Sequence, residues 1–340
     1  MPLTPAQYAK LKALMPNTYA TSPAAKAEAE MLREQGNKPV LTLNGDYPTD
    51  WSEFIGQEPA VAQLKIAIAS AQKRGVRLDH TLLASGAHGI GKTTIAQIVA
   101  CQMDTGFKAV SGPLSIDDAR TTIGQMGNSD ILFWDEFHLA VQGNKSRADW
   151  MLPFLTDSVL LTTGGTVRMP QVTVVAATTD VGKLPQTIIS RFMIKPRLDM
   201  YTDAEAVLIC GKLAQRMNVI VNVPDYPAIV RAAANNPRDM RMILTSIRDQ
   251  QAVQGSYSLP LACEWAGLTE DGLTREAMEM IQVLYCTRNR TMSIESIQAT
   301  LNEPGPLRHH EQALIQRGYV LVTGRGRMLT EAGAARVEEQ

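Results

Sequence analysis

The chain has 340 residues, of which 45% are hydrophobic and 20% are charged. At roughly 150 residues per domain this length predicts two or three domains, and the composition excludes collagen-like, coiled-coil and wholly disordered proteins. The formal net charge of -1 provides no general attraction to nucleic acid, so binding of that kind would depend on local clusters of arginine.

The cysteine usage and the hydropathy pattern indicate a cytoplasmic protein. The four cysteines lie far apart without a C-x-x-C pair, and the five histidines complete no zinc-ligand spacing, which fits a reducing compartment. No run of about 18 apolar residues could span a membrane, and the N-terminus lacks the apolar core of a secretory signal. We therefore expect no membrane association.

Periodicity and turn residues divide the chain into four segments. Residues 1–48 carry two short helical patterns and end in turn residues, so we interpret them as an appended N-terminal helical arm. Residues 49–200 alternate amphipathic helices with short apolar strands, which predicts an α/β core with a mostly parallel sheet. Residues 201–265 have helical spacing and only one strand-like run, which predicts a small α domain. Residues 266–340 contain three helices followed by a glycine-turned hairpin, the order of a winged helix.

The first strand of the core, Thr81–Ser85, is followed by the pattern G-x-x-x-x-G-K-[ST] and then by an amphipathic helix. The glycines of such a P-loop let backbone N–H groups converge on phosphates, while the lysine meets the β- and γ-phosphate charges and the next hydroxyl ligates Mg²⁺. A glycine-rich turn is the alternative. We predict binding of ATP with Mg²⁺, in which Thr93 is a metal ligand. The predicted nucleotide-binding residues are Gly86, Ala87, His88, Gly89, Ile90, Gly91, Lys92, Thr93 and Thr94.

A second apolar strand, Ile131–Trp134, ends in Asp135 and Glu136. Asp135 would hold the Mg²⁺ shell, and Glu136 would polarise the attacking water, because a carboxylate beside a metal-bound triphosphate is a suitable base. By itself, such a pair of carboxylates is a helix cap as often as it is a functional site. Together with the P-loop it predicts ATP hydrolysis. His138 follows one turn later, and we interpret it as structural.

Three further residues are candidates for contact with the nucleotide. Thr179 follows the third apolar strand, Val172–Ala177, where a polar side chain could sit opposite the γ-phosphate or cap the next helix. Arg191 could stabilise the transition state of a neighbouring subunit, or form a surface salt bridge. Arg238 lies at a predicted helix start in the α domain.

The C-terminal segment carries a local excess of positive charge. Between residues 288 and 327 there are six arginines, three glutamates and no lysine. Arg325 and Arg327 lie on the predicted hairpin, where basic side chains can reach DNA phosphates or the minor groove. A solvated hairpin tip is the alternative.

Eight short motifs follow one another along the chain. They are Phe54-Ile55-Gly56-Gln57, Leu78-Asp79-His80-Thr81-Leu82-Leu83, the P-loop, Ile131 to His138, Ala177-Thr178-Thr179, Ser190-Arg191-Phe192, Asn236-Pro237-Arg238, and Gly318-Tyr319 with Gly324-Arg325-Gly326-Arg327. In their order and spacing they resemble the RuvB family, the AAA+ motors of Holliday-junction branch migration, and the resemblance covers residues 49–336.

The resemblance implies a AAA+ core, a helical lid and a DNA-binding winged helix, which work as a homo-hexameric ring of helicase type on duplex or four-way-junction DNA in recombination and repair. It implies the roles of five residues in the nucleotide site and of a third DNA contact. Those roles are sensor 1 for Thr179, arginine finger for Arg191, sensor 2 for Arg238, pocket residues for Tyr201 and Ile55, and a DNA contact for Arg308 beside Arg325 and Arg327.

The chain departs from the family at several places. Ala87-His88 stands where the family usually has two prolines, which we expect to leave nucleotide binding intact. Between Leu155 and Val172 the chain is several residues shorter, and RuvB projects from there the hairpin that grips its partner RuvA, so the shortening argues against dependence on a RuvA-like partner. Val322 replaces an arginine that usually contacts DNA. These departures fit a divergent relative encoded by a phage or mobile element.

Three functions compete. The first, which we favour, is a DNA-translocating ATPase that drives branch migration. The second is a AAA+ loader or remodeller that places a replication or recombination protein on DNA without translocating, and the shortened hairpin and altered wing favour it. The third is a nucleotide-gated assembly protein with little turnover, against which the intact Lys92, Glu136 and Arg191 argue.

Overall fold

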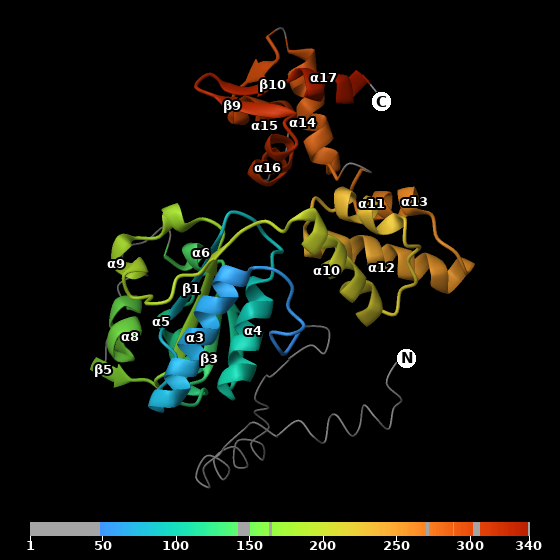
Figure 1. Cartoon of the computed structure of the whole chain (residues 1–340). Coiled ribbons are helices and arrows are strands. Elements are labelled where there is room, and N and C mark those ends of the chain that lie inside the picture. The colour runs from blue at the N-terminus through green and yellow to red at the C-terminus, as the bar shows by residue number, and fades with distance from the viewer. Residues whose placement is uncertain are drawn as a thin grey trace. The chain divides into compact units, whose positions relative to one another are not determined.

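The computed structural model describes residues 48–141, 150–162, 165–269, 272–287, 289–301 and 307–338. The predicted N-terminal arm, apart from its last residue, lies outside the described residues. The chain divides into two compact units, of which one ends at Asp199 and the other begins at Met200 (Figure 1). In the described part of the chain, no helix combines the length and the apolar character that crossing a membrane would require.

The first unit is built on a five-stranded sheet with the order β2-β3-β6-β1-β7, in which every pair of neighbours is parallel. Because the strands are parallel, the loops that leave β1, β3 and β6 emerge at one edge of the sheet, from three adjacent strands. The elements are α3 (Glu58–Arg74), β1 (Thr81–Ser85), α4 (Lys92–Met103), β2 (Phe107–Ser111), α5 (Ile116–Gly124), β3 (Ile131–Asp135), α6 (Phe137–Val141), α8 (Met151–Asp157), β4 (Val159–Thr162), β5 (Gly165–Arg168), β6 (Thr173–Thr178), η1 (Val181–Lys183), α9 (Gln186–Ile189) and β7 (Arg197–Leu198).

Helices cover both faces of this sheet, which confirms the predicted α/β core. α4 packs against β3 and β6, and α3 packs against α4 (Figure 1). Side chains along a strand point alternately to the two faces. Leu132 and Trp134 of β3 therefore join Val174 of β6 in the cluster on the other face, beneath α5, α6, α8 and α9.

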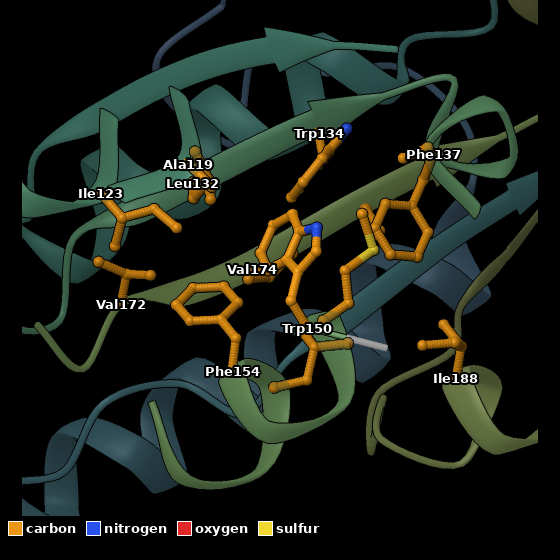
Figure 2. Packing of buried hydrophobic residues seen from close by; sticks show 14 of the residues in the cluster. Ala119, Ile123, Leu132, Trp134, Phe137, Trp150, Phe154, Val172, Val174 and Ile188 are labelled. Atoms are coloured by element: carbon orange, nitrogen blue, oxygen red, sulfur yellow. The ribbon is translucent and has the colours of Figure 1, made fainter. Parts of the chain in front are cut away.

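That cluster is rich in aromatic side chains, as Figure 2 shows. The Trp134 ring meets Phe137 edge-on at 5.4 Å between centroids and lies 6.1 Å from the Trp150 ring. The buried indole Nε1 of Trp134 donates a hydrogen bond to the Gly112 carbonyl at 2.9 Å, so its polar atom is satisfied. These contacts hold the carboxyl end of β3, where Asp135 is the last residue of the strand and Glu136 comes next.

At two places the strands differ from the apolar pattern of the sequence. The edge strand β2 was not predicted, because it has a single neighbour in the sheet and buries only Phe107, so its sequence shows no apolar run. The run Val219–Val223 is not a strand, and its side chains Ile220 and Val223 are 79% and 80% exposed. Among the described residues 201–265 the elements are helices, so this part of the chain offers no strand with which the run could pair.

The segment expected to be shortened folds as a small antiparallel hairpin of β4 and β5, with four residues in each strand. The two strands form a sheet of their own and do not join the five-stranded sheet. Leu160 of β4 is buried in the aromatic cluster, while Leu161 is half exposed. The hairpin is therefore anchored at its base by one face only.

The second unit begins with four helices. The capping box of α10 explains its sharp start, because Thr202 Oγ1 accepts from the Glu205 backbone N–H while the Glu205 carboxylate accepts from the Thr202 N–H. Asn236 caps α12 in a similar way, through a bond from the Arg238 N–H. The helices are α10 (Asp203–Arg216), α11 (Asp225–Ala232), α12 (Pro237–Gln254) and α13 (Leu259–Trp265).

The remainder of this unit confirms the predicted winged helix. Three helices precede a hairpin, and a short extra strand joins it to give an antiparallel sheet of order β8-β10-β9. A separate apolar core includes Leu273, Ile281, Ile297, Leu314 and Val320. The elements are α14 (Arg275–Cys286), β8 (Thr291–Met292), α15 (Ile294–Leu301), α16 (Arg308–Gln316), β9 (Val320–Thr323), β10 (Gly326–Leu329) and α17 (Glu331–Glu338).

Candidate nucleotide-binding and hydrolysis site

The P-loop runs from β1 to the first turn of α4. Gly89 and Gly91 have φ angles of 73° and 96°, in the left-handed region where glycine is not strained. Gly91 is the N-cap of α4 and provides no side-chain cap. A helix start of this kind presents backbone N–H groups and the positive end of the helix dipole to a phosphate.

Lys92, the first residue of α4, is buried and folds back over the loop. Its Nζ donates to the Ser85 hydroxyl at 2.9 Å and to the Ala87 carbonyl at 3.0 Å. Ser85 in turn donates to the same Ala87 carbonyl at 2.7 Å. The positive charge is thus held against the loop by the last residue of β1. Nothing in the sequence pattern pointed to Ser85, because its part depends on the direction of the lysine side chain.

The two carboxylates stand at the end of β3, which neighbours β6 in the sheet, and β1 lies on the other side of β6. Asp135 is half-buried, and its Oδ1 accepts a hydrogen bond from the Glu136 N–H at 3.0 Å. Glu136 has a φ of 45°, so its backbone is in the left-handed region that an L-residue seldom adopts. Such strain is typical of functional positions, where the surrounding structure holds the residue in place.

Three side chains surround the Glu136 carboxylate. Thr179, which follows β6, donates to Oε2 at 3.1 Å. The Nδ1 atom of His138 lies 3.3 Å from the same oxygen. The Nδ1 atom of His88, in the P-loop, lies 3.3 Å from the other oxygen, Oε1. The structure therefore brings together Glu136 and Thr179, both predicted as catalytic, and adds two histidines to them.

These contacts govern the protonation state of Glu136. The hydrogen bond from His88 is the main cause that lowers the pKa of Glu136 to about 2, and the bond from Thr179 and the charge of Lys92 act in the same direction. Partial burial opposes them without reversing the shift. Glu136 is consequently a carboxylate throughout the neutral pH range.

His138 combines the expected structural role with a place in the site. Its ring is buried, and its Nδ1 also lies 3.0 Å from the Thr178 hydroxyl, which accepts from the Asp180 N–H. Burial is the main cause that lowers the pKa of His138. The neutral ring thus links the end of β6 to Glu136, a contact that its position one turn after the strand did not reveal.

The donor set fits Mg²⁺ bound through phosphates. Among the described residues, no three His, Cys, Asp or Glu side chains gather closely enough to hold a metal ion by themselves. Mg²⁺ is usually held by one or two protein oxygens together with substrate phosphates and water. Thr93 and Asp135 are both half-buried, at the start of α4 and the end of β3, and would supply such oxygens.

Arg191 follows α9 and is exposed. Its guanidinium makes no hydrogen bond or ion pair with the described residues, whereas the next side chain, Phe192, is fully buried in the aromatic cluster. The backbone is thus anchored while the charged group points to solvent. This arrangement suits a residue that acts on a neighbouring subunit.

The remaining predicted pocket residues lie in different units. Ile55 is half-buried just before α3, and the side chain of Gln57 fastens this segment to Asp199 by bonds of 2.6 and 3.1 Å. Tyr201 is buried and Arg238 is exposed in the first turn of α12; both belong to the second unit.

The wing places its two arginines in different environments. Arg325 is exposed in the two-residue turn between β9 and β10. Arg327 instead forms a two-pronged ion pair with the buried Glu311 of α16, at 2.5 Å from Nε to Oε1 and 3.1 Å from Nη2 to Oε2. The guanidinium that the sequence assigned to DNA is therefore occupied within the domain. Arg308 begins α16, but its side chain lies outside the described residues, and Val322 is exposed on β9.

Two family models match the chain. Residues 47–198 match the Holliday junction DNA helicase RuvB P-loop domain, and residues 270–338 match the RuvB C-terminal winged helix domain.

Curated relatives and solved structures agree with these matches. A Holliday junction branch migration complex subunit RuvB from Chlorobaculum tepidum is 32% identical over 310 residues, covering 85% of this chain and 88% of the relative. The corresponding subunit from Chlorobaculum parvum is 33% identical, with 85% and 89% covered. The solved Thermotoga maritima RuvB Holliday junction branch migration motor has a TM-score of 0.74 at 27% identity, covering 86% of this chain and 98% of that one.

Proposed function

This chain belongs to the RuvB family, and from that premise we propose that it is an ATP-driven motor that moves duplex DNA and migrates Holliday junctions in recombination and repair. The observation that carries the proposal is the meeting of the P-loop with Glu136 and Thr179 at the ends of three adjacent strands, in a chain that also carries the family's winged helix. A cytoplasmic location suits this activity.

The protein is an ATPase that uses Mg²⁺, and the geometry suggests how its residues divide the work. The loop N–H groups and Lys92 would bind the phosphates, while Thr93 and Asp135 would hold the metal ion, which neutralises phosphate charge when bound. Glu136, ionised at neutral pH, would accept a proton from the attacking water. Thr179 would orient that carboxylate through its hydrogen bond to Oε2.

The residues outside this cluster fit a ring of identical subunits. The exposed Arg191 would reach the nucleotide of a neighbour and stabilise the transition state, as an arginine supplied in trans does in other nucleotide hydrolases. Ile55 would line the nucleotide pocket of the first unit. The roles of Tyr201 as a pocket residue and of Arg238 as sensor 2, in the helical lid proposed for residues 201–265, remain predictions from the family resemblance. A closed homo-hexamer is the assembly that repeats this contact at every interface.

DNA binding is assigned to the winged helix. We keep Arg325 as the contact of the wing, because Arg327 is held by Glu311, and we keep Arg308 as a contact at the start of α16. A single arginine on a two-residue turn can meet a phosphate but is poorly placed to read a base, so binding would be tolerant of sequence.

A loader or remodeller that does not translocate on DNA is the second candidate. The observation in its favour is the short β4–β5 hairpin, with four residues in each strand, in the segment where a RuvA contact was expected to be lost.

Dissociation of a synthetic four-way junction with ATP, in the presence and absence of RuvA, tests the proposal. The motor predicts ATP-dependent conversion of the junction to two duplexes without RuvA, and no conversion by the Lys92→Ala variant. ATP hydrolysis that DNA stimulates without any conversion would favour the loader. If DNA neither binds nor changes ATP hydrolysis, both candidates fail.

A further inference from the structure

The P-loop side chain of His88 contacts the proposed catalytic base. Its Nδ1 lies 3.3 Å from Glu136 Oε1, and its side chain remains 36% exposed, whereas that of Glu136 is 21% exposed. The contact joins the loop that follows β1 to the carboxylate that follows β3. It therefore connects the part of the site that receives phosphates with the part that activates water.

The three partners of Glu136 differ in how they are anchored. Thr179 donates a hydrogen bond to Oε2, and the buried His138 lies against the same oxygen. The sheet and the aromatic cluster hold the segments of both residues in place. His88 lies against Oε1, and it comes from a glycine-rich loop that includes two left-handed glycines. A change in the loop can thus release Oε1 while Oε2 stays fixed.

Groups that crowd a carboxylate limit the access of the attacking water to it. Thr179 donates a hydrogen bond to Oε2, and Nδ1 of His88 lies against Oε1. A donor on Oε1 takes one of the lone-pair directions that a water molecule would use, so Oε1 is fully available to the attacking water only after that donor leaves. The donor most exposed to a competing anion is His88, because the loop on which it lies is the one that faces phosphates.

We propose that His88 restrains Glu136 through the bond between Nδ1–H and Oε1, and that this bond persists when a nucleoside triphosphate binds at the loop and must open, with the imidazole turning to the phosphates, before the base can act. His88 is therefore a positioning residue that acts through Glu136, and this inference rests on the proposed ATPase function. The restraint depends on a side-chain donor, which alanine and proline lack and asparagine retains, since Asn Nδ2 stands as many bonds from Cα as His Nδ1.

The test compares His88→Ala with His88→Asn in steady-state ATP hydrolysis and in equilibrium binding of a fluorescent ATP analogue. Loss of one hydrogen bond should raise kcat about three- to tenfold in His88→Ala, while KM and analogue affinity change less than about twofold. His88→Asn should stay near the wild type, because its amide supplies the missing donor. A role in loop structure alone would instead change affinity, and both variants would shift together.

A second arm uses the Glu136→Gln background, in which the restrained base is already lost. There, His88→Ala should leave the residual rate unchanged, whereas an equal increase in both backgrounds would overturn the restraint. A lower kcat in His88→Ala would overturn it as well. If the wild type hydrolyses no ATP but His88→Ala does, the restraint is confirmed. If both proteins are inactive with DNA present, the proposed ATPase function is wrong, and the inference about His88 is wrong with it.

Discussion

Substitution of the two wing arginines should have opposite consequences. Arg327→Ala removes the partner of Glu311, whose side chain is only 7% exposed, while that of Arg327 is 21% exposed. Removing one member of a buried ion pair costs about 3–5 kcal/mol, because the remaining charge stays desolvated. Since Arg327 is partly solvated, we expect a cost somewhat below this scale, about 2–3 kcal/mol of local stability. Arg325→Ala, on the adjacent turn, removes an exposed charge and should cost almost nothing.

Native-state hydrogen exchange of the full chain measures this difference. A loss of about 1.4 kcal/mol of local stability raises the exchange rate tenfold. In the Arg327→Ala variant, the amides of β9 and β10 should therefore exchange roughly 30- to 150-fold faster than in the wild type. Exchange in Arg325→Ala should match the wild type. Replacing Glu311 by Gln in the Arg327→Ala background should recover much of the protection, because it removes the unpaired buried charge.

DNA binding at several salt concentrations provides the second measurement. One lost phosphate contact flattens the slope of log affinity against log salt by about 0.9, and we expect that change for Arg325→Ala. The reasoning would be refuted if Arg327→Ala left exchange unchanged and flattened the slope by the same amount. Such a result would mean that Arg327 leaves Glu311 when DNA binds and contacts a phosphate instead.

Three further predictions concern the core. Glu136→Gln should keep ATP binding and lower turnover at least about 100-fold, because an amide cannot accept the proton of the attacking water. Arg191→Ala should bind ATP through its own Lys92 yet be inactive, and mixing it with Lys92→Ala subunits should restore part of the hydrolysis. His80 is buried, its Nδ1 accepts from the Val174 N–H, and burial lowers its pKa to about 3. Between pH 6.5 and 3 the unfolded chain therefore binds more protons than the folded chain. As the pH is lowered through this range, the free energy of unfolding should decrease by up to about 1.4 kcal/mol per pH unit.

Each of these has a decisive control. Near-normal turnover in Glu136→Gln would remove that residue from its role as base. No mixture more active than either parent would place the arginine finger elsewhere than Arg191. For the pH effect, His80→Asn keeps an acceptor for Val174 without a titrating group, so denaturant unfolding at pH 7 and 5.5 should show a smaller stability loss than in the wild type. Equal losses in both proteins would assign the acid sensitivity to other groups.

Local pattern was sufficient for much of this protein. The P-loop, the carboxylates Asp135 and Glu136, and the helix–hairpin order of the winged helix could all be predicted, because each depends on residues close together in the chain: turn glycines, a strand ending in acids, helical spacing. Thr179 could be proposed from its place at a strand end, since parallel strands bring their carboxyl ends to one edge of the sheet.

Tertiary structure decided the contacts that run between such elements. His88 could be read only as a loop residue, His138 only as structural and Arg327 only as a basic residue on a turn, until the fold placed them against Glu136 and Glu311. The edge strand β2 escaped prediction for a related reason, because its pairing with β3 and not its own apolar content makes it a strand. Periodicity reports which face of an element is buried, whereas the partner of a polar side chain depends on sheet order and side-chain direction, which arise only when distant segments pack together.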